Sequence, residues 1–109
     1  MLVHGYSVYG IDVDERTGCA HYRSALDIIA IRFKCCQRYY PCHHCHDVVA
    51  DHPIKRWNSN EFYNEAVLCG HCGQQLTIQQ YLTCNNQCPN CQANFNPGCR
   101  LHHDHYFSE

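Results

Sequence analysis

The sequence predicts a small, metal-stabilised domain that is irregular, with short β-hairpins and one or two short helices. The chain has 109 residues, of which eleven are cysteine and ten are histidine. Its one clear apolar run is residues 26–33, so little apolar surface is available to offset the conformational entropy of folding. Small chains of this kind usually depend on disulfides or on a structural metal. The cysteines are therefore expected to be part of the folding mechanism.

Metal ligation accounts for the cysteines better than disulfide pairing does. The number of cysteines is odd, and histidines stand beside them at short spacings, which disulfides do not require. Residues 1–15 lack the basic, apolar and small-residue pattern of a secretory leader. No apolar stretch is long enough to predict a membrane-spanning helix. Because thiols must stay reduced to bind metal, we expect a cytoplasmic location.

The chain pattern predicts only short regular elements. In the first part of the chain we expect a strand over 6–14 with Val8 and Val13 facing inward, a turn around Gly18 and a helical turn at 24–27. A β-hairpin over 28–42, with Cys35 and Cys36 at its tip, and a helix over 46–52 ended by Pro53 are expected to follow. The last expected elements are a strand at 66–69 and a helix over 77–83. Thr77 and Gln80 have the spacing of a capping box for this last helix. The cysteine-free residues 53–65 are expected to separate two metal-binding halves.

Two CxxC units in the second half give the strongest signal. They contribute Cys69, Cys72, Cys88 and Cys91, with fifteen residues between the two units. Matched knuckles at this spacing predict a four-thiolate tetrahedral site of the zinc-ribbon kind. The alternative is a pair of redox motifs, but a redox CxxC is normally solitary and opens a helix.

The first half supplies enough candidates for two more tetrahedral sites. These are Cys19, His21, Cys35, Cys36, Cys42, Cys45, His46 and His52. Cys42 and Cys45 form a CxxC whose thiolates would chelate one ion, whereas the adjacent His46 should point toward a second ion. Cys19 and His21 are two residues apart, so on an extended strand their side chains face the same way. The division of the eight ligands stays open on these grounds alone.

These residues resemble the CHY-type zinc finger family. The resemblance rests on "CAHY" at 19–22, "CC" at 35–36, "YYPCHHCH" at 39–46, His52, "CGHC" at 69–72 and "CPNC" at 88–91. It spans about residue 10 to Phe107 and is closest to the short, stand-alone, bacterial-like members. The family is also found in ubiquitin ligases, ahead of a RING, and in a helper of small-Tim assembly in the mitochondrial intermembrane space. No residues remain here for a RING.

The resemblance implies one domain over 1–109 and three structural zinc ions. It comprises a two-zinc half at 10–52 and a zinc-ribbon-like half at 66–107. The implied sites are Cys19, His21, Cys42 and Cys45 for the first ion, Cys35, Cys36, His46 and His52 for the second, and Cys69, Cys72, Cys88 and Cys91 for the third. An exchange of one cysteine between the first two ions is the main alternative.

Several cysteines, histidines and aromatic residues remain outside these sites. Cys84, Cys99 and His102 could form a fourth site, or the cysteines could be small buried hydrophobes. His43 and His44, inside the CxxC loop, are expected to face solvent. Most aromatic side chains are expected in the core, although Trp57 or Phe62 could instead form an exposed partner-binding patch.

The composition favours a binding module over an enzyme. All three sites reach four protein ligands, and a catalytic zinc needs an open position. We expect a protein partner, and neither a small-molecule substrate nor a membrane. Metal or thiol handling, as a zinc donor, chelator or redox helper, is the alternative. The net charge of −2 falls to about −5 if nine thiolates bind three Zn²⁺, which argues against nonspecific nucleic-acid binding.

Overall fold

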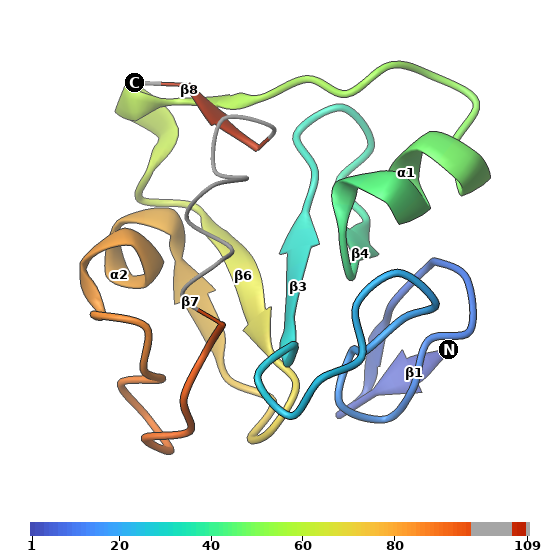
Figure 1. Ribbon diagram of the computed structural model, residues 1–109. Helices are drawn as coiled ribbons and strands as arrows, with labels where there is room; N and C mark the ends of the chain where they lie inside the picture. Colours follow the sequence, from blue (N-terminus) through green and yellow to red (C-terminus); the bar gives the residue numbers. More distant parts are fainter. Residues whose placement is uncertain (97–105, 109) are drawn as a thin grey trace.

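A four-stranded antiparallel sheet forms the centre of the computed structural model, which describes residues 1–96 and 106–108. Its strand order is β4 (Tyr39–Tyr40), β3 (Ile29–Arg32), β6 (Glu65–Cys69) and β7 (Gln75–Thr77). In Figure 1, β3 and β6 run side by side through the middle of the molecule. This pairing joins a strand from the first half of the chain to one from the second half.

Both faces of the sheet are covered, which explains why β3 and β6 are apolar almost throughout. Alternate side chains of a strand point to opposite faces. Ile29 and Ile31 of β3 belong to the main core with Phe33, Val67 and Leu76. Ala30 instead packs on the other face with residues of the N-terminal hairpin, which are Val3 and Val8, and with Tyr39 and Leu68.

The predicted hairpin with a cysteine pair at its tip is present. β3 and β4 pair with Ile31 opposite Tyr40 and Arg32 opposite Tyr39, so Cys35 and Cys36 lie in the connecting turn. The turn is closed by the Gln37 N–H, which donates to the Phe33 carbonyl at 2.8 Å. Gln37 adopts a φ of 58°, the left-handed conformation that tight turns use.

The two helices are short. α1 (His43–Val49) begins at Cys42, whose sulfur accepts a hydrogen bond from the Cys45 N–H, and it ends before the extended Ala50. The predicted range of 46–52 was therefore too late at both ends. α2 (Ile78–Thr83) has the predicted capping box, because the Thr77 and Gln80 side chains each accept from the other residue's N–H.

The predicted strand at 6–14 is wrong for most of its length. β1 (Leu2–Val3) and β2 (Tyr6–Ser7) form a hairpin, and Val8 makes only an isolated bridge to Tyr39. The following residues turn away, with Asp12 at a φ of 52°. Val8 is buried as predicted, whereas Val13 is half-buried. Residues 24–27 form a hydrogen-bonded turn and no helix.

The cysteine-free segment contains β5 (Trp57–Asn58) and the 3-10 turn η1 (Ser59–Glu61). β5 pairs in parallel with β8 (Phe107–Ser108), which holds this last described strand against the middle of the chain. No helix among the described residues is long and apolar enough to cross a membrane. The division into halves at 10–52 and 66–107 stays a prediction.

Candidate metal centres

The first cluster consists of Cys19, His21, Cys42 and Cys45. Their ligand atoms all lie within 4.8 Å of one another. His21 Nδ1 is 3.4 Å from Cys45 Sγ and 3.5 Å from Cys42 Sγ, and the Cys19 and Cys42 sulfurs are 3.7 Å apart. The three cysteines are buried, whereas His21 is exposed. The cluster therefore points its sulfurs inward and its imidazole toward solvent.

These distances fit a tetrahedral zinc site. Zn–S bonds of about 2.3 Å and Zn–N bonds of about 2.0–2.1 Å place tetrahedral ligand atoms about 3.4–3.8 Å from one another. In the first cluster, the three distances from His21 Nδ1 to the sulfurs and the distance between the Cys19 and Cys42 sulfurs run from 3.4 to 3.8 Å. A disulfide would bring two sulfurs to about 2.05 Å, so the 3.7 Å between Cys19 and Cys42 excludes that bond here.

The second cluster consists of Cys35, Cys36, His46 and His52, again within 4.8 Å. His46 Nε2 lies 3.2 Å from Cys35 Sγ and 3.9 Å from Cys36 Sγ, and the two sulfurs are 4.0 Å apart. His46 is fully buried and stacks on Phe33, with ring centroids 4.5 Å apart. Both cysteines and His52 are only half-buried. Three of the four ligands thus reach the surface.

Asp51 holds His52 in place. Its carboxylate lies 3.0 Å from His52 Nδ1 and is fully exposed, and the hydrogen bond from His52 lowers the pKa of the Asp51 carboxyl. His52 Nε2 is buried and has no hydrogen-bond partner among the described residues, which leaves this atom free to bind a metal. A carboxylate on the far nitrogen is a common support for a ligating histidine.

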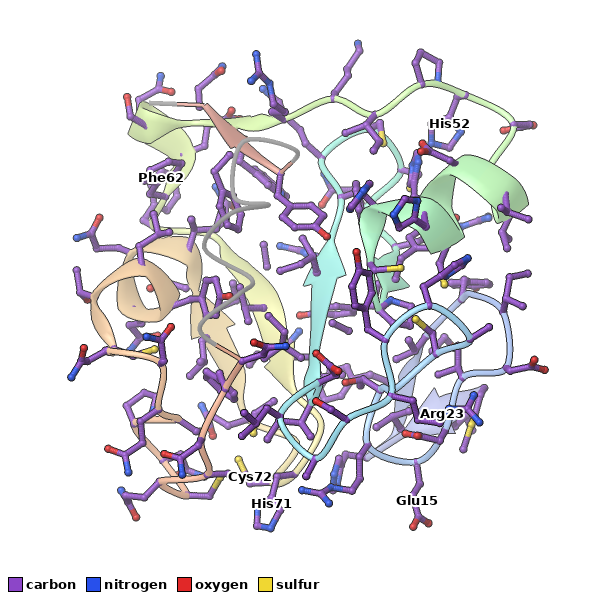
Figure 2. All side chains as sticks on the ribbon, viewed as in Figure 1. Glu15, Arg23, His52, Phe62, His71 and Cys72 are labelled. Atoms are coloured by element: carbon purple, nitrogen blue, oxygen red, sulfur yellow. The ribbon has the colours of Figure 1, made fainter. Side chains whose placement is uncertain are left out.

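The third cluster consists of Cys69, Cys72, Cys88 and Cys91. Cys69 and Cys91 have sulfurs 3.8 Å apart, as do Cys72 and Cys88, which matches a tetrahedral four-thiolate site. Cys69 and Cys88 are buried, whereas Cys72 and Cys91 are half-buried. Figure 2 shows Cys72 and His52 on opposite sides of the molecule.

The pKa values of the cluster thiols indicate that a bound cation is needed for all of them to ionise. Hydrogen bonds from Cys42 and Cys45 lower the pKa of Cys19, and donating these same hydrogen bonds to Cys19 raises the pKa of Cys42 and of Cys45. Burial raises the pKa of Cys69. Burial acts in the same direction on Cys72, but hydrogen bonds, led by the Asn90 amide at 3.4 Å, lower its pKa to about 7. A bound dication would allow all thiols of a cluster to ionise together.

Helix α1 connects the first two clusters. Cys45 and His46 are adjacent, and the helix directs Cys45 to the first cluster and His46 to the second. Burial, together with the nearby His52, lowers the pKa of His46, which keeps the imidazole neutral and able to ligate. One peptide unit therefore separates ligands of two sites.

The N-terminal region packs on the CxxC turn at residues 69–72 of the third cluster, a contact that sequence reasoning missed. A Cβ added to Gly70 would lie 2.2 Å from the Arg16 carbonyl oxygen, so the two backbones touch. His4 Nε2 lies 2.9 Å from the Gly70 carbonyl oxygen. These contacts join the loop that precedes Cys19 to the second half of the chain. No signal in the sequence marks His4 for this role.

The structure brings the twelve predicted ligands together in three groups of four, with the predicted membership. No cysteine is exchanged between the first and second clusters, which was the main alternative. That each group holds its own ion stays a prediction. Of the fourth-site candidates, Cys99 and His102 lie outside the described residues. Cys84 Sγ lies 3.1 Å from the Tyr81 carbonyl oxygen, and Cys84 belongs to no cluster among the described residues.

Some predictions for the remaining side chains were wrong. His43 is buried beside Tyr106, whose hydroxyl accepts a hydrogen bond from the His43 N–H at 3.1 Å, whereas His44 is exposed as predicted. Trp57 and Phe62 are 4% and 8% exposed, which excludes them as a surface patch. Trp57 Nε1 instead donates to the Arg32 carbonyl at 2.8 Å.

Comparisons with known proteins agree with the geometry. The chain is 44% identical over 100 residues to Helper of Tim protein 13 of Kluyveromyces lactis, which covers 92% of this chain and 87% of that protein. It is 40% identical to Helper of Tim protein 13 of Saccharomyces cerevisiae, over 93% of this chain and 90% of that protein. An uncharacterized protein of Schizosaccharomyces pombe is 38% identical, over 94% of this chain and 90% of that protein.

These relatives do not bear out the expectation of a bacterial-like member, because the chain matches fungal proteins over nearly its whole length. The profile of the CHY zinc finger matches residues 19–96, a span that contains all twelve cluster residues. The three clusters are suited to zinc in their donor atoms and their spacing. The chain belongs to the CHY zinc finger family.

Proposed function

We propose that this chain is a non-catalytic, zinc-held module that binds other proteins and serves as a helper of small Tim proteins. The observation that carries the proposal is the likeness, over 92% and 93% of the chain, to two proteins named Helper of Tim protein 13. The geometry supports the structural part, because each cluster offers four protein ligands and so fills a tetrahedral zinc without a substrate position.

This role favours the mitochondrial intermembrane space, the compartment that the family resemblance attaches to such a helper, over the predicted cytoplasm. Fractionation of cells that carry the tagged chain tests the compartment. Recovery with cytosolic markers alone would contradict this part of the proposal.

Binding is tested with the zinc-loaded full chain and a purified small Tim protein, using isothermal titration calorimetry. We expect saturable binding by the loaded chain. Binding should be lost in a Cys88→Ser variant, because that variant breaks the third cluster. The matched control is Cys84→Ser, which removes a thiol outside the three clusters and should bind normally. If the loaded chain binds no small Tim protein, this proposal fails.

A second candidate function is zinc handling. It is favoured by the half-buried cysteines of the second and third clusters, which leave part of each site within reach of an incoming ligand. It requires that at least one zinc ion exchanges readily from the native protein. If all bound zinc resists a competing chelator for hours, this candidate fails. Nucleic-acid binding, the third hypothesis, would appear as salt-dependent binding to DNA or RNA.

A further inference from the structure

We propose that the second cluster is the exchangeable zinc site of this protein, and that His52 is the ligand that leaves. This inference rests on the second candidate function and assigns it to one site and one side chain. It concerns how tightly the chain's own residues are held in the second cluster.

Three of the four ligand residues of the second cluster are only half-buried. The first cluster has three buried cysteines and the third has two, whereas both thiols of the second cluster are half-buried and His46 is its one buried ligand. An incoming donor can therefore approach the second site from the side of Cys35, Cys36 and His52. The third site also has two half-buried thiols, but two buried cysteines hold its inner side, and the first site has three buried cysteines.

The second cluster also has the fewest thiol donors of the three. The third cluster has four thiolates and the first has three, whereas the second has two thiolates and two imidazoles. Thiolates are the softer ligands and suit zinc well. Loss of one imidazole from the second cluster would leave two thiolates and one imidazole. Loss of His21 from the first would still leave three buried thiolates.

Within the second cluster, His52 differs from the other three ligands in how the fold holds it. Cys35 and Cys36 are fixed by the β3–β4 hairpin, and His46 is fixed by α1 and by its stack on Phe33. His52 lies in residues 50–56, which form no helix or strand between α1 and β5. Its hydrogen-bond partner is Asp51, a neighbour in the chain whose carboxylate is fully exposed. His52 also meets the His46 ring edge-on, with centroids 5.0 Å apart, but it is the one ligand of this cluster that neither the β3–β4 hairpin nor a helix fixes.

Exchange at this site is a ligand substitution without oxidation or reduction. The bond between zinc and His52 breaks, the imidazole leaves as a neutral base, and a thiolate or another chelating donor takes the vacated position. Figure 2 shows His52 at the periphery, where such a donor could approach.

The test uses the full chain loaded with zinc and the chelator 4-(2-pyridylazo)resorcinol, with release followed by absorbance and by native mass spectrometry. We expect one zinc equivalent to leave in a fast phase and the remainder to leave slowly. His52→Cys should slow the fast phase at least about tenfold, because it adds a third thiolate, and His52→Ala should remove or accelerate it by a similar factor. The matched control is His71→Ala, an exposed histidine that is not a cluster ligand and lies at the third cluster, which should leave the fast phase unchanged.

Cadmium substitution identifies the site. The ¹¹³Cd resonance moves with the number of thiolate ligands, so the three clusters should give separate signals. We expect the signal of the two-thiolate site to disappear first when chelator is added. Earlier loss of the four-thiolate signal, or a fast phase that His52→Cys leaves unchanged, overturns this inference while zinc handling stands. If no equivalent leaves fast, zinc handling fails as well.

Discussion

Gly70 marks a close contact between the loop that precedes Cys19 and the third cluster. Gly70→Ala would place a methyl group 2.2 Å from the Arg16 carbonyl oxygen, so either the loop at Arg16 or the Cys69–Cys72 turn of the third cluster would have to shift. We expect a loss of about 1–3 kcal/mol in the free energy of unfolding. The denaturant midpoint in excess zinc measures this loss.

Gly5→Ala is the control for Gly70→Ala. Gly5 has a φ of +87° but no atom within 4 Å of an added Cβ, so its substitution should cost about 1 kcal/mol through backbone conformation alone. Only Gly70→Ala should also speed zinc release from the third cluster. If Gly70→Ala matches the parent chain in both measurements, the contact with Arg16 is not as described.

The thiol groups predict how zinc binding depends on pH. Five cluster thiols have pKa values raised above their ordinary value, chiefly by burial or by a neighbouring sulfur: Cys36, Cys42, Cys45, Cys69 and Cys91. These thiols are protonated at pH 7 in the metal-free protein. Each must lose its proton when zinc binds, so the apparent zinc affinity should rise with pH.

Calorimetric zinc titrations in buffers of different ionisation enthalpy count these protons. At pH 7 we expect at least five protons to be released when the three clusters fill. A release of less than one proton for each zinc would show that the thiols are already ionised before metal arrives.

At the scale of single residues, spacing in the chain predicted the clusters well. Cys42 and Cys45 are close in sequence, and a CxxC brings its own sulfurs together whatever the surrounding fold is. The burial of His43 could not be predicted, because it depends on Tyr106, which is 63 residues away. The contact of His4 with Gly70 is equally remote in sequence.

Among the elements, α2 has the most explicit start signal. The Gln80 N–H donates to Thr77 Oγ1 at 3.0 Å, and the Thr77 N–H donates to Gln80 Oε1 at 2.8 Å. Thr77→Ala removes the hydroxyl acceptor, and we expect a loss of about 1 kcal/mol in the free energy of unfolding. Thermal unfolding followed by circular dichroism measures it.

Thr83→Ala is the matched substitution at the other end of α2. Its hydroxyl is exposed and donates to the Gln79 carbonyl at 2.8 Å, without capping the helix start. We expect a change of less than about 0.5 kcal/mol. Equal losses in the two variants would argue against a capping role for Thr77.

Elements with a local cause were predictable, and those with a distant partner were not. The β3–β4 hairpin and α2 follow from residues within each segment. β5 and β8 are two residues long and exist because Trp57 and Phe107 pair across the chain. The start of α1 was missed because the capping atom is the sulfur of Cys42, which sequence reasoning treated only as a metal ligand.

For the whole molecule, the β3–β6 pairing links the stability of the two halves. Cys69 is at once a ligand of the third cluster and the partner of Ile29 in the sheet. Cys69→Ser should therefore remove one zinc equivalent and also disturb the backbone of β3. Native mass spectrometry counts the metal, and ¹H–¹⁵N spectra follow the amides of Ile29–Arg32.

Cys84→Ser serves as the control, since Cys84 stands outside the three clusters of the described residues. It should retain the zinc content and the β3 amide shifts of the parent chain. Unchanged β3 amides in zinc-depleted Cys69→Ser would mean that the two halves are energetically independent.

Because Cys45 and His46 are adjacent on α1, the first two ions are expected to bind in a fixed order, the first cluster before the second. Once an ion binds to the first cluster, Cys42 and Cys45 fix α1. His46 then already faces the second cluster, so the second ion binds to a site that is largely preformed. Its departure should leave the helix tethered through Cys42 and Cys45. We therefore expect folding to depend on the first ion. The second ion should bind and dissociate while the protein stays folded.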